Sequence, residues 1–276
     1  MTKTTEETKG TALTTASASS LPAELLQNLE TDAGRGVSTD PNEVGIPFLY
    51  ILQDMSPQVK KRDPAYIDGA EVGDIYNNVT KEIIQAKHGF EFISCHFEPA
   101  QVEWKPDRGG FVAKHANDTP LLSDVRMTQV EDKMLPLLPN GNILTETKYY
   151  YGFYRPAVAE GETNPHTWEA CVIGMSSTMI ACSRELQAFF KKATLPSGAV
   201  APSFAKVYTF GTRVKEKNNN SWFIWDIRPL RWVDGQEYAA ARAFAEQAER
   251  GIKVANDEGD ATASEGGLSP EDEKVL

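Results

Sequence analysis

The stretch Lys206–Arg228, KVYTFGTRVKEKNNNSWFIWDIR, is the part of the chain that decides the fold class. Two segments of strand-forming residues, 206–215 and 222–227, flank a polar segment with three consecutive asparagines. Asparagine tolerates the left-handed dihedral angles of tight turns. The pattern therefore predicts an antiparallel β-hairpin whose tip lies at 216–221.

Four further segments upstream of this hairpin have the length and composition of strands. They are compact, apolar or aromatic, and lie at 47–52, 90–97, 148–155 and 168–175. Short segments of this kind, separated by turn residues, are typical of β-strands. The folded part of the chain is therefore expected to be mainly β.

Two helices are predicted to interrupt this β pattern. The segment 176–194 starts with serine and threonine, which favour helix N-termini, and continues with apolar residues at helical spacing. The segment 235–256 carries an apolar stripe at i, i+3 and i+4 on a background of strong helix formers. Strands with inserted helices, rather than βαβ repeats, indicate a β-dominated α+β fold, either a compact barrel or a curved sheet.

The charge of the 276-residue chain is −11, and most of it lies at the two ends. Residues 1–40 carry a net charge of −3 and residues 257–276 a net charge of −6, which leaves −2 for residues 41–256. Both ends are polar and are expected to be disordered, because little apolar surface offsets the entropy lost on ordering. The nearly neutral middle can carry basic patches, so the overall acidity does not exclude an anionic partner.

Composition excludes several classes of protein. No apolar stretch reaches the 18 residues of a membrane span, and the N-terminus lacks the pattern of a secretory signal. Cys95, Cys171 and Cys182 have no CxxC spacing, which favours a reducing compartment and argues against a disulfide framework or a metal site. The common catalytic motifs are missing, so we predict no enzyme and no cofactor. A hydrolase that uses the Asp54–Asp74 region is the weakest alternative.

One face of the predicted hairpin has the composition of a nucleic-acid interface. By alternation, Phe223, Trp225 and Ile227 are expected to face the core. The opposite face would present one ring and three cations, namely Trp222, Arg213, Lys215 and Arg228. Bases stack on such rings while phosphates meet the cations. A solvated face with cation–π pairs, or a contact between subunits, explains the same pattern.

Two other segments are candidates for the same interface. The loop that starts at Trp104 combines this ring with Lys105 and Arg108 and ends in a flexible glycine pair. The strand 148–155 has aromatic residues on both faces, so Tyr150 and Tyr154 are expected at the surface if the other set is buried. The alternative for the loop is an ordinary connection, and the alternative for the strand 148–155 is a strand of the core.

Several segments resemble phage-encoded proteins commonly labelled single-stranded DNA-binding. The resemblance is carried by the following segments: 45–58 (GIPFLYILQDMSPQ), 69–77 (GAEVGDIYN), 104–111, 176–179 (SSTM) and 215–223 (KEKNNNSWF). It covers about 45–233 and implies an OB-like barrel with an acidic C-terminal tail. The expected organisation is then a disordered arm at 1–40, a β-rich core at 41–234, a C-terminal helix at 235–255 and an acidic tail at 256–276. A β-sandwich of the virion-structural kind stays open as an alternative fold.

The resemblance also implies a function. It implies sequence-independent binding of single-stranded DNA in phage DNA replication or recombination, without catalysis, in the host cytoplasm and away from membranes. The tail would dock replication or recombination enzymes through Asp272, Glu273, Val275 and Leu276. The alternative is a virion structural or assembly protein whose aromatic surfaces make subunit contacts. Homo-oligomerisation stays open.

Overall fold

The computed structural model describes residues 45–106, 110–130, 133–159, 162–217 and 220–250, with a few single positions between 22 and 31. The predicted N-terminal arm at 1–40 lies outside the described residues except for those few positions. The predicted tail at 256–276 lies wholly outside them, and so does Arg108.

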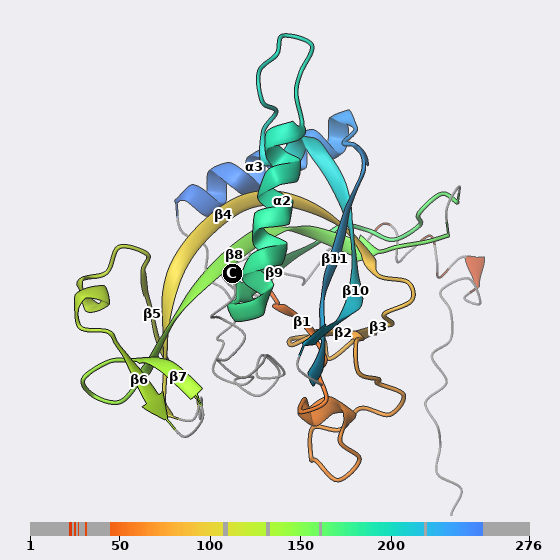
Figure 1. The fold of residues 1–276 in the computed structure, drawn as a ribbon. Helices are drawn as coiled ribbons and strands as arrows, with labels where there is room; N and C mark the ends of the chain where they lie inside the picture. The colour runs from red at the N-terminus through yellow and green to blue at the C-terminus, as the bar shows by residue number, and fades with distance from the viewer. Residues whose placement is uncertain are drawn as a thin grey trace, which may run out of the picture.

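An eight-stranded antiparallel sheet makes up most of the fold (Figure 1). Its strands are β4 (Phe90–Trp104), β5 (Phe111–Ala116), β6 (Arg126–Val130), β7 (Lys133–Leu137), β8 (Ile143–Pro156), β9 (Glu169–Ser176), β10 (Lys206–Lys217) and β11 (Asn220–Trp232). The order is β11-β10-β4-β8-β7-β6, with β5 paired to β4 and β9 paired to β8. The prediction of a β-dominated α+β fold is thus confirmed.

The long strands β4 and β8 divide the sheet into a body and an arm. They pair with each other from Phe90↔Pro156 to Trp104↔Ile143. At the first end β10, β11 and β9 complete the body, and at the other end β5, β6 and β7 form the arm, which projects at the lower left of Figure 1. Trp104, the last residue of β4, therefore lies in the arm.

A small second sheet lies between the two free edges of the body. It consists of β1 (Leu49–Ile51), β2 (Ile75–Asn77) and β3 (Ile83–Ile84). On one side the Val172 amide of β9 donates to the Pro47 carbonyl at 2.8 Å. On the other side the Gln53 side-chain amide bonds to both backbone groups of Phe223 in β11, at 2.8 and 3.0 Å.

The predicted OB-like barrel is therefore corrected to an open sheet. In the described part of the chain, no backbone ladder joins β9 to β11. The reason is that the backbone of the short strand β1 is hydrogen-bonded to β2. The segment around β1 therefore reaches β9 through one isolated bridge and reaches β11 through the side chain of Gln53. The gap between the edges is bridged but not closed by strand pairing.

Both predicted helices are present, and they cover opposite faces of the sheet. A 3₁₀ turn at Ser177–Met179 precedes α2 (Ile180–Lys192), so this helix begins later than predicted. The other helix, α3 (Gly235–Glu249), begins with a capping box in which Asp234 and Glu237 bond to each other's backbone N–H groups. Figure 1 shows α2 in front of the sheet and α3 behind it, and their side chains join different core clusters.

These two cores explain the tyrosine-rich sequence of β8. Tyr150 and Tyr154 belong to the core under α2, whereas Tyr149 and Tyr151 belong to the core under α3. Successive residues of a strand point to opposite faces of the sheet. Because both faces of β8 are covered, aromatic residues occupy consecutive positions of this strand instead of every second position.

Candidate functional site

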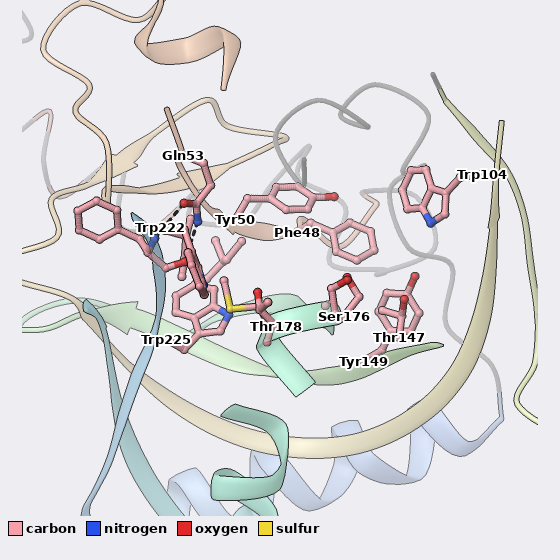
Figure 2. Close-up of a pocket in the computed structure, with 16 residues that line it drawn as sticks. Phe48, Tyr50, Gln53, Trp104, Thr147, Tyr149, Ser176, Thr178, Trp222 and Trp225 are labelled. Carbon is pink, nitrogen blue, oxygen red and sulfur yellow. Dashed lines mark hydrogen bonds between the residues drawn. The ribbon is translucent and has the colours of Figure 1, made fainter. Parts of the chain in front are cut away.

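A cleft opens where the body, the small sheet and the arm meet (Figure 2). Its cavity volume is about 80 Å³, and the space between its walls is about 800 Å³ when open solvent is included. Residues of β1, the ends of β8 and β9, the 3₁₀ turn at Ser177–Met179 and β11 line it, together with Trp104 from the arm. Its lining contains no charged residue.

Aromatic rings form most of the walls of this cleft. Phe48 and Tyr50 are stacked, with ring centroids 5.6 Å apart, and Tyr149 lies edge-on to Phe48 at 6.1 Å. Figure 2 shows Trp104 at one end of the cleft and Trp222 and Trp225 at the other. The walls of the cleft are therefore mainly aromatic.

Hydroxyl groups line the side opposite Phe48 and Tyr50 (Figure 2). Thr147 of β8 and Ser176 of β9 are register partners, so their side chains share one face of the sheet. Thr178 of the 3₁₀ turn continues this row. An apolar cavity with a few polar groups on one wall is the usual form of a small-molecule or single-group binding site.

Two lysines lie over aromatic rings that line the cleft. The Lys215 Nζ lies 5.9 Å from the centre of the Trp222 ring, and the Lys114 Nζ lies 5.1 Å from that of Tyr149. Lys114 is also paired with Glu98 at 2.7 Å. The lining is therefore neutral, while two of its rings are each contacted by a lysine, one of which is paired with an acid.

The expectation that Trp222 is exposed is wrong. Only 4% of Trp222 is exposed. Trp225 is buried, as predicted. Trp222 does share a face with Lys215, but α2 packs on that face, and its Glu185 reaches Arg213 at 3.1 Å. Alternation in a strand gives the face on which a residue lies but cannot tell which helix will cover that face.

The other cations of the hairpin lie at the surface and have acidic neighbours. Arg213 is paired with Glu185, and Arg228 with Asp226 at 2.9 Å. Exposed ion pairs of this kind contribute little free energy. Both guanidinium groups can therefore exchange these partners for a phosphate at small cost.

The expectation that Tyr150 and Tyr154 are exposed is also wrong, because both are core residues. The Tyr150 hydroxyl bonds to the Ser183 hydroxyl at 2.8 Å, and burial raises its pKa. The Tyr154 hydroxyl accepts from Asn77 at 3.0 Å, and burial raises its pKa too. The second layer formed by α2 and the small sheet covers them, which the strand pattern does not indicate.

The structure brings together two of the predicted site residues, Trp104 and Trp222, which line the same cleft from opposite ends. Lys105 follows Trp104 and is exposed. The tail residues Asp272, Glu273, Val275 and Leu276 lie outside the described residues. The assigned roles of all these residues stay predictions.

Several cleft residues were not predicted as site residues. They are Phe48, Tyr50, Thr147, Tyr149, Ser176 and Thr178. They come from three segments far apart in the chain, around 48–50, 147–149 and 176–178, and no spacing in the sequence connects these segments. The one local signal is the run Ser176-Ser177-Thr178, which reads as a helix cap although the Ser176 side chain makes no cap bond.

Catalytic groups are not apparent in the described part of the chain. Among its residues no three His, Cys, Asp or Glu side chains are placed to hold a metal ion. Burial raises the pKa of the Cys171 and Cys182 thiols, so neither is an activated nucleophile. Asp74 accepts bonds from the Glu71 and Ala86 amides and thereby holds a turn.

The chain was compared with protein families, curated proteins and solved structures. The family model described as Pam3 phage gp34-like protein matches residues 14–253. No curated protein and no solved structure matches the chain. None of the described helices is long and apolar enough to span a membrane.

Proposed function

The chain belongs to the Pam3 phage gp34-like protein family, and on this premise we propose that it binds single-stranded DNA without sequence specificity. The binding would serve phage DNA replication or recombination and involve no catalysis. It would use the aromatic cleft rather than the outer face of the hairpin, because Trp222, Tyr150 and Tyr154 are buried.

The observation that carries this proposal is the distribution of charge around the cleft. The lining is aromatic and uncharged, whereas Lys215 and Lys114 lie over the rings of Trp222 and Tyr149, and Lys105 is exposed beside Trp104. A single strand has the same division, with flat neutral bases on one side and phosphates on the other. Proteins that bind single strands combine stacking rings with cations that follow the backbone.

The rival function, a virion structural or assembly protein, has one observation in its favour. A cleft without charged residues also accommodates an apolar side chain of a protein partner. The two functions differ in their salt dependence, since phosphate contacts release counterions and apolar contacts do not.

Titration of labelled oligo(dT) at two or more salt concentrations tests the proposed function. We expect an affinity that falls steeply as salt rises, with a log–log slope of about −0.7 for each phosphate that is neutralised. Absence of binding at low salt would contradict the proposal and favour the assembly function.

Replacing Trp104 with alanine should weaken oligo(dT) binding by about 1–3 kcal/mol, the usual stacking contribution of one ring. Trp104 is half-buried at the mouth of the cleft, so its loss removes a stacking surface. The matched control is Trp232→Ala, because Trp232 is 47% exposed, also carries a lysine over its ring and does not line the cleft. Equal losses for both variants would show that the cleft is not the binding site.

The role of the acidic segment 257–276 is tested by removing it. Seven acidic residues and one lysine give it a net charge of −6. A tethered polyanion competes with DNA for the cations beside the cleft, most strongly at low salt. We therefore expect tighter oligo(dT) binding by the shortened chain at low salt and equal binding at high salt. Unchanged affinity at low salt would leave the segment only its docking role for replication or recombination enzymes.

A further inference from the structure

The hydroxyl row of the cleft is unusually free of partners. The side chains of Thr147, Ser176 and Thr178 make no hydrogen bond with any other described residue. Thr147 and Thr178 are nonetheless more than nine-tenths buried. Their hydroxyl oxygens are not among the fully buried unpaired atoms of the described residues, so they face the open space of the cleft and can bond to a group that enters it.

The backbone holds this row in place by an uncommon conformation. Ser177, between Ser176 and Thr178, has a φ of +49°, one of two positive values among the described non-glycine residues. Such left-handed residues persist only where the surrounding structure enforces them, and they cluster at binding sites. Ser176 stands at the N-cap of the turn and yet its hydroxyl makes no cap bond.

A fourth polar group of the residues that line the cleft also lacks a partner. The indole N–H of Trp222 is buried and has no acceptor in the described part of the chain. Trp222 lines the same cleft as Ser176 and Thr178. The lining thus combines three hydroxyl groups and one unpaired indole N–H with aromatic walls, and it carries no charge.

We propose that the cleft takes one nucleobase at a time from a bound strand, stacked on its aromatic wall and hydrogen-bonded at its edge by Ser176 and Thr178. This inference rests on the proposed function and names the group that the site recognises. A hydroxyl rotates to donate or to accept, so the same row satisfies the edge of any base. Base contact and lack of sequence preference are therefore compatible.

The test uses the full chain, two cleft variants, one control variant and two probes. Ser176→Ala and Thr178→Val remove one hydroxyl each with little change in shape. Thr209→Val is the matched control, because Thr209 lies on β10 away from the cleft. The probes are oligo(dT) and an abasic oligonucleotide of the same length, and thermal unfolding checks that each variant folds.

We expect the wild-type chain to bind oligo(dT) at least ten times more tightly than the abasic strand. Each cleft variant should lose about 2- to 10-fold in affinity for oligo(dT), the range for one neutral hydrogen bond. Affinity for the abasic strand should not change, and Thr209→Val should behave as wild type.

Three results would overturn the base-binding cleft. Equal affinity of the wild-type chain for both probes, or unchanged oligo(dT) affinity in both folded cleft variants, would reject it and leave the proposed function standing. No oligo(dT) binding by the wild-type chain would reject both, and would leave the cleft to an apolar group of a protein partner.

Discussion

Replacing Gly152 with alanine is expected to destabilise the protein by about 3 kcal/mol or more, the upper range for overpacking. Gly152 lies in β8, opposite a β-bulge of β4 at Ser94–His96. A Cβ atom at this position would lie far inside van der Waals contact with the Ile93 carbonyl oxygen. It would also meet the Phe92 ring at 2.8–2.9 Å. Neither group can move freely, because one is backbone and the other is fully buried in the core.

Gly211→Ala is the matched control for this substitution. Gly211 lies in β10 of the same sheet, and a Cβ atom there meets nothing within 4 Å. Chemical denaturation of both variants gives the two free energies of unfolding. We expect Gly211→Ala to change the stability by less than about 1 kcal/mol. A similar, small effect of both variants would show that the bulge does not bring the two strands this close.

Replacing Gln53 with leucine is expected to cost about 2–4 kcal/mol of unfolding free energy. The Gln53 amide donates to the Phe223 carbonyl and accepts from the Phe223 N–H, as a neighbouring strand would. Leucine has a similar volume but leaves both backbone groups of Phe223 without a partner. Since this contact bridges the small sheet to β11, the loss should appear as a lower denaturation midpoint. An unchanged midpoint would mean that water replaces the amide without penalty.

Gln53→Glu tests the same contact through pH. A carboxylate can accept from the Phe223 N–H but repels the Phe223 carbonyl, whereas a protonated carboxyl donates to that carbonyl. The folded state therefore raises the pKa of this glutamate above its unfolded value of about 4.3. Stability relative to wild type should be greatest below that value and should fall as pH rises through the folded pKa. A difference from wild type that does not depend on pH would contradict this reading of the contact.

The two-residue period of the hairpin and the helical period of 176–194 and 235–256 sufficed to predict these elements. The structure has them as β10–β11, α2 and α3. These patterns arise within one element, because a strand or helix that buries one face must repeat its apolar residues at its own period. The structure differs from these predictions only locally. One example is the 3₁₀ turn at Ser177–Met179, where Ser177 adopts a positive φ.

The site residues could be predicted only in part. Trp104 was recognised because a ring beside a cation and glycines stands out in a loop, and it does line the cleft. Trp222 was assigned to the correct face, beside Lys215, but that face is buried. Thr147 and Ser176 are ordinary strand residues, and only their pairing across β8 and β9 places their hydroxyls together.

The sequence by itself determined the β-rich class, the hairpin, the two helices and the concentration of acidic charge at both ends. These depend on the composition and period of single segments. Only the tertiary structure decided that the sheet stays open, because this depends on whether β1 pairs with β2 or with the edges of the body. It likewise decided which aromatic residues α2 covers and which ones line the cleft, since burial is set by contacts between elements far apart in the chain.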